Sequence, residues 1–85
     1  MSNVISPQHY ITTLSNGHKV ECLDIIESLN MSLNRGSAFQ YVWRAGRKEG
    51  TIEKEIEDLE KAVFYLNREI KFLKKQKEEL DDVPF

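Results

Sequence analysis

The spacing of hydrophobic positions changes along the chain, and each change predicts a different element. Residues 10–22 hold two β-rich runs on either side of Asn16-Gly17. Asn-Gly is typical of the centre of a tight hairpin turn, so this segment predicts a short β-hairpin. From about Val20 the apolar residues recur every three or four positions instead, which predicts a first helix.

A glycine separates this first helix from a second. Because glycine commonly follows the last turn of a helix, we expect the first helix to end before Arg35-Gly36. Ser37 and Gln40 have the spacing of a capping box, which predicts that the second helix starts at Ser37 and closes near Lys48. Backbone N–H groups at that helix start would suit an anion.

The third predicted helix is long and carries a heptad pattern. We expect Thr51 to cap it, and apolar residues then alternate steps of four and three as far as Leu80. About 29 helical residues would extend roughly 43 Å, which is more than a domain of this size covers. Residues 52–80 therefore predict a homo-oligomer interface, and β-branched a positions with leucine at d favour a parallel pair. The seam consists of Ile56, Val63, Ile70 and Lys77 at a, and Ile52, Leu59, Leu66, Leu73 and Leu80 at d.

A second stripe on the same helix is expected to pack against the two shorter helices. It runs along the flank of the seam, and its aromatic members can cover those helices. The stripe consists of Asp58, Ala62, Tyr65, Glu69 and Phe72.

Length and composition bound the class of protein. The 85 residues predict one mainly α domain, 1–85, made of a leader or hairpin (1–19), a helical pair (20–50) and the long helix (51–80). A net charge of −2 argues against a nucleic-acid-binding protein. The single cysteine rules out an internal disulfide and favours a reduced, cytoplasmic setting. No apolar run approaches the roughly 18 residues that cross a bilayer, so no membrane association is expected.

A basic cluster stands out against this acidic balance. No acid lies between Arg35 and Lys48, and the predicted second helix places five polar side chains on one face. An amide, a phenol and cations on one face suit a nucleotide or another phosphorylated ligand. The alternative is a solvated helix end whose cations the helix dipole favours. The five side chains are Gln40, Tyr41, Arg44, Arg47 and Lys48, and Ser37 at the expected cap lies on the same face.

The second stripe is expected to bring further residues to this site. Asp58 would meet Arg44, and an ion pair between them is favoured over acid–base chemistry. Lys61 lies one turn further on, and Tyr65 follows it at the edge of the expected pocket.

His9-Tyr10 follows Pro7 in an otherwise polar leader. Either the leader forms a turn that packs its ring on the domain, or His9 reaches the pocket as a donor or proton-transfer group. The histidines and the cysteine give little support to a metal site, so we expect no metal and no other cofactor. A Walker loop, a dinucleotide motif, a Ser-His-Asp set and CxxC are absent, and the sequence assigns no catalytic residue.

Three ordered motifs resemble those of a family of small bacteriophage proteins. The family's blocks are Pro-x-His-Tyr, Gly-Asn-Ala-x-Lys-Tyr-x-x-Arg and Asp-Leu-x-Lys-Ala-x-x-Tyr-Leu. The resemblance covers nearly everything from Pro7 to Leu66, with Arg47-Lys48 following the second block. The matching segments here are Pro7-Gln8-His9-Tyr10, Gly36-Ser37-Ala38-Phe39-Gln40-Tyr41-Val42-Trp43-Arg44 and Asp58-Leu59-Glu60-Lys61-Ala62-Val63-Phe64-Tyr65-Leu66.

The resemblance implies nucleotide chemistry, because the family includes a metal-independent phage nucleotide kinase that acts on deoxynucleoside monophosphates. Ser37 and Gln40 replace the family's Asn and Lys, and loss of a cation weakens phosphoryl transfer more than binding. We therefore expect a phage-type protein in the host cytoplasm that binds a nucleotide near a subunit interface and sequesters it, for example a signalling nucleotide of host defence. The alternatives are the metal-independent kinase and a coiled-coil adaptor that acts on a host protein.

Overall fold

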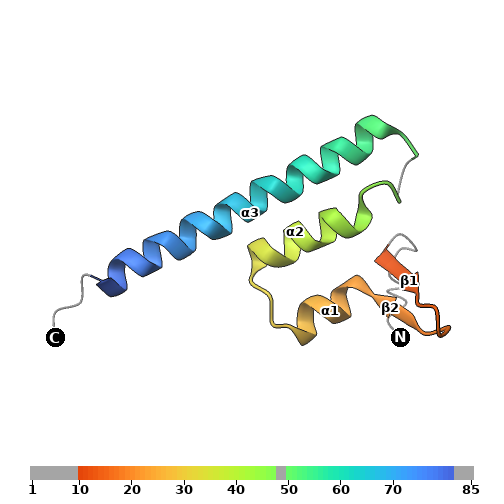
Figure 1. The fold of residues 1–85 in the computed structure, drawn as a ribbon, viewed down its shortest axis with the longest axis horizontal. Helices are drawn as coiled ribbons and strands as arrows, with labels where there is room; N and C mark the ends of the chain where they lie inside the picture. The colour runs from red at the N-terminus through yellow and green to blue at the C-terminus, as the bar shows by residue number, and fades with distance from the viewer. Residues whose placement is uncertain (1–9, 48–49, 82–85) are drawn as a thin grey trace, which may run out of the picture.

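The computed structural model describes residues 10–47 and 50–81, and its fold is mainly helical, as predicted (Figure 1). A two-stranded hairpin comes first, and three helices follow, the last of which is much the longest. The elements are β1 (Ile11–Thr13), β2 (Lys19–Glu21), α1 (Cys22–Ser28), α2 (Leu33–Arg44) and α3 (Ile52–Asp81).

The predicted hairpin is confirmed. β1 and β2 pair antiparallel, with Thr12 opposite Val20. Gly17 takes a positive φ of 88° at the turn, and the backbone N–H of His18 donates to Oδ1 of Asn16 at 3.0 Å. Asn-Gly therefore forms the turn because asparagine bonds the local backbone and glycine accepts the left-handed conformation.

The first predicted helix, which was to run from about Val20 to Arg35, is wrong at both ends. Val20 belongs to β2, and α1 covers only Cys22–Ser28. Asn30 takes a positive φ of 51°, and the N–H groups of Asn30 and Met31 donate to the carbonyls of Glu27 and Ile26 at 3.0 Å. This is the hydrogen-bond pattern of a Schellman motif, with asparagine in the position that glycine usually fills, and it ends the helix.

The predicted start of the second helix at Ser37 is also wrong. α2 begins at Leu33, because Oγ of Ser32 accepts a hydrogen bond from the backbone N–H of Arg35 at 3.1 Å and caps the helix. Gly36 is buried inside α2. A Cβ at Gly36 would lie 3.1 Å from Cγ2 of Ile26, so glycine allows α1 to approach α2 closely. Gly36 is therefore a packing residue, and it offers no helix N-terminus to an anion.

α2 ends at Arg44, earlier than the predicted end near Lys48. Ala45 has φ −53° and ψ 123°, Gly46 has φ +78°, and the N–H of Arg47 donates to the carbonyl of Arg44 at 2.8 Å. These values describe a type II turn, which requires a positive φ at its third residue. Arg47 therefore leaves the helix. The prediction that Arg47 shares a helix face with Arg44 is wrong.

The long third helix is confirmed, and its expected cap is present: Oγ1 of Thr51 accepts from the N–H of Lys54 at 3.2 Å. α2 lies beside the first half of α3, and the second stripe faces it, with Asp58, Ala62 and Glu69 buried. Phe72 is 59% exposed and lines a surface pocket with Asn34, near the start of α2. Phe72 thus covers the shorter helices only at this end of α2.

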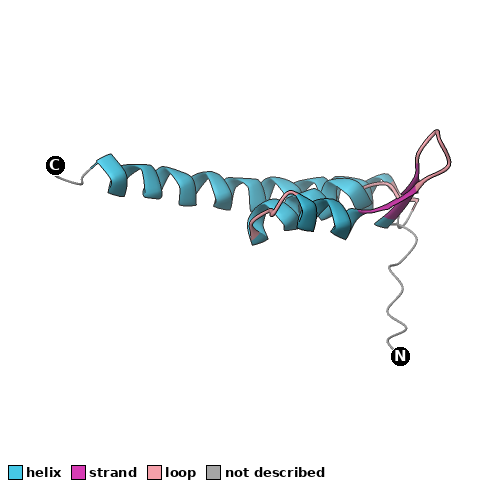
Figure 2. Cartoon of the chain, turned by 90° about the horizontal axis from the view of Figure 1, so that it is seen from below, coloured by secondary structure: helices cyan, strands magenta, loops and turns pink. Residues whose placement is uncertain are grey.

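The three helices lie side by side in one layer, which Figure 2 shows edge-on. Among the described residues the buried hydrophobic ones are small, namely Cys22, Ala38 and Ala62. The α3 seam lies beside the stripe that packs on α2, and each of its apolar positions is 40% or more exposed. The radius of gyration is 16.7 Å, whereas about 12 Å is typical of a compact domain of this length. The layer thus leaves most of its apolar surface uncovered.

Candidate functional site

An ion pair between α2 and α3 forms the centre of the candidate site. Nη2 of Arg44 lies 2.7 Å from Oδ1 of Asp58, and Nε of Arg44 lies 3.3 Å from Oδ2. The Asp58 side chain is only 1% exposed and that of Arg44 13%. The two hydrogen bonds from Arg44 to Asp58 fix the plane of the guanidinium group. Both side chains are largely shielded from water.

The pair shifts the ionisation of both residues. The hydrogen bond from Arg44 is the main cause that lowers the pKa of Asp58, and the charge of Arg44 adds to it against the opposing effect of burial. The hydrogen bond to Asp58 in turn raises the pKa of Arg44. Asp58 therefore stays ionised at neutral pH and does not serve as a proton donor, as the preference for an ion pair had indicated.

Aromatic rings and a second cation surround this pair. The rings of Tyr41 and Tyr65 stack with centroids 5.9 Å apart and an interplanar angle of 11°. The guanidinium carbon of Arg44 lies 4.9 Å from the centroid of Tyr41, and Nζ of Lys61 lies 5.4 Å from it. The structure thus places two cations within cation–π distance of one phenol. We call Tyr41, Arg44, Asp58, Lys61 and Tyr65 the tyrosine–cation cluster.

Lys61 is the more accessible of the two cations. Its Nζ lies 2.9 Å from Oε1 of Glu57, one turn away on α3, and its side chain is 40% exposed. This exposed pair raises the pKa of Lys61 and lowers the pKa of Glu57. An exposed pair of this kind is weak, so a ligand can replace Glu57 as the partner of Lys61.

The N-terminal part of the chain also reaches the cluster. Tyr10 contributes to the raised pKa of Arg44 through its charge and a side-chain hydrogen bond. Arg47 lies apart: its Nη2 donates to Oγ1 of Thr12 at 3.1 Å, and its guanidinium lies 5.7 Å from the Trp43 ring. The hairpin therefore holds Arg47 away from the ion pair.

Six of the ten expected ligand residues thus come together, and the others do not join them in the described part of the chain. Gln40 lines a different cavity, which α1 and α2 share. Arg47 bonds the hairpin. His9 and Lys48 lie outside the described residues. The six are Tyr10, Tyr41, Arg44, Asp58, Lys61 and Tyr65.

A second polar network was not foreseen. Oγ of Ser32 donates to Oε2 of Glu69 at 2.7 Å, and Nε of Arg35 lies 2.9 Å from the same oxygen. Ser32 thus both caps α2 and ties it to α3. The signal was available in the sequence, since a serine directly before an apolar residue is a common N-cap and Glu69 belongs to the second stripe.

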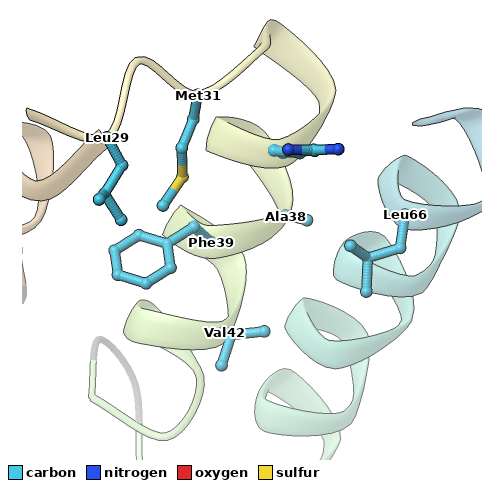
Figure 3. Close-up of a pocket in the computed structure, with 7 residues that line it drawn as sticks. Leu29, Met31, Ala38, Phe39, Val42 and Leu66 are labelled. Atoms are coloured by element: carbon cyan, nitrogen blue, oxygen red, sulfur yellow. The ribbon is translucent and has the colours of Figure 1, made fainter. Parts of the chain in front are cut away.

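The cavity of about 360 Å³ in Figure 3 has a different character. Its lining is almost wholly apolar, and it lies between the loop after α1, α2 and Leu66 of α3. Arg35 at its edge is already paired with Glu69. The cavity is therefore unsuited to a charged ligand. Its lining residues are Leu29, Met31, Arg35, Ala38, Phe39, Val42 and Leu66.

Two other classes of site are absent from the described residues. Residues 10–47 and 50–81 contain no group of three or more His, Cys, Asp and Glu side chains placed to hold a metal ion. Over the same residues, no helix is both long and apolar enough to span a membrane. The buried Cys22 thiol has a pKa raised by loss of solvent, which makes it a weak nucleophile.

Comparison with known proteins gives a family. No curated protein and no solved structure matches the chain significantly. A family model does match, described as a protein of unknown function (DUF3310), over residues 4–67. The match spans the hairpin, α1, α2 and α3 as far as residue 67, which includes all residues of the tyrosine–cation cluster. The chain therefore belongs to the DUF3310 family.

Proposed function

We propose that the chain binds a phosphorylated nucleotide at the tyrosine–cation cluster. The observation that carries this proposal is that Arg44 and Lys61 both lie within cation–π distance of the Tyr41 ring, which stacks with Tyr65. Cations supply the charge that a phosphate needs, and aromatic rings with hydroxyl groups supply stacking and hydrogen bonds for a base or sugar. This combination favours a nucleotide over a simple anion.

Arg44 retains binding capacity although it is paired with Asp58. A guanidinium group has five N–H donors; Asp58 accepts two of them, one from Nε and one from Nη2, and the side-chain hydrogen bond with Tyr10 uses a further donor. The remaining donors can bind phosphate oxygens, while Asp58 keeps the group in a fixed orientation. Lys61 adds a mobile cation on a flexible stem.

We further propose that binding takes place in the cytoplasm and serves to sequester the nucleotide. The proposal that the nucleotide is a signalling nucleotide of host defence rests on the resemblance to small phage proteins. The same resemblance makes the metal-independent kinase the alternative function. Among the described residues, Arg44 and Lys61 are the cations of the cluster that could contact a transferring phosphoryl group. Gln40 occupies the position at which the similar phage proteins have a lysine. Binding needs less charge compensation than transfer does.

Lys61 offers the cleanest test, because both Lys54 and Lys61 pair with Glu57 but only Lys61 contacts the cluster. We expect a panel of mono-, di- and cyclic nucleotides to contain one that raises the melting temperature. Lys61→Gln should weaken the binding of that nucleotide about tenfold, as expected for the loss of one charged contact. Lys54→Gln is the matched control and should bind like the parent.

Two results would replace this function by its rivals. Formation of nucleoside diphosphates from a triphosphate and a deoxynucleoside monophosphate in EDTA would establish the kinase instead. If no nucleotide raises the melting temperature, binding at the cluster is wrong, and the adaptor becomes the better hypothesis.

We also propose that the chain self-associates through α3. The seam repeats apolar residues at heptad spacing, and it stays exposed in the single chain. A patch of this size is unusual on a monomer and typical of an interface.

A further inference from the structure

The layer of helices has one apolar side. Val42 of α2 is 53% exposed and lines the apolar cavity with Leu66, which belongs to the α3 seam. Leu29, Met31 and Phe39 line the same cavity, and Figure 3 shows them grouped on the side of α2 that is farther from Leu66. The seam of α3 and these residues therefore form one continuous surface, which we call the apolar face.

The tyrosine–cation cluster lies on the other side of the layer. Val42 and Arg44 are two residues apart, which is about 200° around a helix of 3.6 residues per turn. Lys61 and Leu66 are five residues apart, which is about 140° from one another around α3. A partner on the apolar face would thus leave the cluster open to solvent.

Between residues 52 and 77, α3 is also divided by charge, and the three acids among residues 78–81 follow this stretch. Residues 52–66 contain five acids and two bases, for a net charge of −3. Residues 67–77 contain five bases and one acid, for a net charge of +4. Two such helices attract one another when they run in opposite directions and repel when they run in the same direction.

We propose that a second copy of the chain covers the apolar face, with the two α3 helices antiparallel and Val63 opposite the partner's Leu66. This goes beyond self-association, because it fixes the direction, the register and the second surface that is buried. The pair has two layers, as stable domains do, and each helix layer covers the exposed side of the other.

The position of α2 supports the antiparallel direction. α2 lies on one flank of α3, against Asp58, Ala62 and Glu69. In an antiparallel pair like flanks meet, so α2 stacks on its counterpart and the apolar cavities face each other. In a parallel pair each α2 would instead meet the opposite flank of the partner, which carries Glu60 and Asn67.

The heptad composition alone favours a parallel pair, but that preference comes from helices with both flanks free. Here α2 occupies one flank of each α3. A parallel pair would also place Lys77 at an a position against its own copy, which costs free energy through like-charge repulsion.

The register follows from the apolar positions and the charges together. With Val63 opposite the partner's Leu66, positions 56 and 73 face each other, as do positions 59 and 70. The pairing is centred near the middle of the α3 segment that α2 covers, between Asp58 and Glu69. It also brings Glu60 beside the partner's Lys74, on the flank that α2 leaves free.

Distances between spin labels at the same position of the two chains distinguish an antiparallel from a parallel pair of α3 helices. Cysteines replace Asn67 and Gln76, two exposed amides, one at a time in a Cys22→Ala background, and each carries a spin label. The antiparallel register predicts an axial separation of about 8 Å for labels at 67 and about 34 Å for labels at 76, at 1.5 Å per residue. A parallel pair predicts equal, short separations at both positions.

A charge exchange tests the register. Lys74→Glu should weaken dimerisation about two- to tenfold, since exposed ion pairs are individually weak. Adding Glu60→Lys should restore it. Within one chain these residues are about 21 Å apart along α3, so rescue requires contact between chains.

The outcomes separate this inference from the proposed self-association. Light scattering that returns 9.9 kDa would overturn both. A multiple of that mass with a short distance at 76, or without charge rescue, overturns the antiparallel pairing alone. A short distance at 67, a long one at 76 and rescue by the exchanged charges together support it.

Discussion

At the scale of single residues, Arg44 connects the stability of the chain to its proposed site. Its guanidinium group bonds Asp58, lies over Tyr41 and is reached by Tyr10. The group is held in one orientation by a carboxylate that has almost no access to water. The same contact that joins α2 to α3 therefore prepares a cation for a ligand, and mutation of Arg44 would change both stability and binding.

Removing the carboxylate should destabilise the fold strongly. Asp58→Ala leaves the poorly solvated Arg44 without its partner, and we expect the free energy of unfolding to fall by about 3 kcal/mol. Urea denaturation at a fixed protein concentration measures this. Glu57→Ala, the adjacent exposed carboxylate, is the control and should change stability far less. Similar losses in the two variants would contradict a structural role for the Arg44–Asp58 pair.

The same pair predicts a loss of stability in acid. Because the folded-state pKa of Asp58 lies below its value in the unfolded chain, its contribution is complete above about pH 4 and is lost as the pH falls through the folded-state pKa. Asp58→Asn removes the titrating group. We expect its free energy of unfolding to vary less than that of the parent below about pH 4, measured by urea titrations at several pH values. Equal slopes in the two proteins would refute this.

At the scale of elements, single backbone positions decide where the helices stop. Asn30 ends α1 in a left-handed conformation, and Gly46 ends α2 in a type II turn. The second of these stops matters for the site, because it keeps Arg44 in the last turn of α2 and turns Arg47 towards the hairpin. The separation of the two arginines is thus a property of the turn.

Gly46 should not tolerate a side chain. It has a φ of +78°, and a Cβ there would lie 3.1 Å from Cδ of Glu55. We expect Gly46→Ala to lower the free energy of unfolding by about 1–2 kcal/mol. Gly50→Ala is the matched control, because a Cβ at Gly50 meets nothing within 4 Å. Thermal unfolding of both variants measures the difference, and equal melting temperatures would show that the turn is not constrained.

The cap of α2 should contribute separately. Ser32→Ala removes the acceptor of the Arg35 N–H and a donor to Glu69, so we expect a loss of about 1–2 kcal/mol. Ser28→Ala, at the exposed end of α1, is the control. Circular dichroism in urea measures both, and an unaffected Ser32→Ala would contradict its part in joining α2 to α3.

At the scale of the whole molecule, a single layer of helices leaves little to bury. The hydrophobic residues that are buried among the described ones are small, and many of the large exposed ones lie on the apolar face. A second layer is the usual way to cover such a surface. The proposed ligand site lies on the opposite side, so in the proposed pair assembly and ligand binding use different surfaces. This differs from the expectation, drawn from the sequence, that the ligand binds near a subunit interface.

Charges in the seam should therefore lower the molecular mass in solution. Ile70→Asp and Leu73→Asp each place a carboxylate on the apolar face, where burial is costly. We expect light scattering at micromolar concentration to give a lower mass for both than for the parent. Lys75→Asp introduces the same group on the outer side of α3 and should leave the mass largely unchanged. Equal masses for all four proteins would show that the seam is not the interface.

The sequence by itself determined the hairpin, the helical class and the length of α3, because Asn16-Gly17, the Thr51 cap and a long heptad series are local signals. Helical spacing also put Tyr41 and Arg44 on one face of α2, and Asp58 and Tyr65 on one stripe of α3. Only the tertiary structure decided where α1 and α2 divide. From the sequence, Asn30 and Gly36 could each lie within a helix or at the end of one. The close approach of Ile26 to Gly36, which only the tertiary structure shows, distinguishes the two possibilities.

The position of the seam relative to α2 was likewise a tertiary decision. Two stripes run along α3, and either could have packed on α2 by periodicity alone. The buried Asp58 and Glu69 find partners on α2, whereas the apolar stripe has no need of hydrogen bonds and can stay open for another chain. Polar groups that lose water must be paired within the fold, and that requirement oriented the helix.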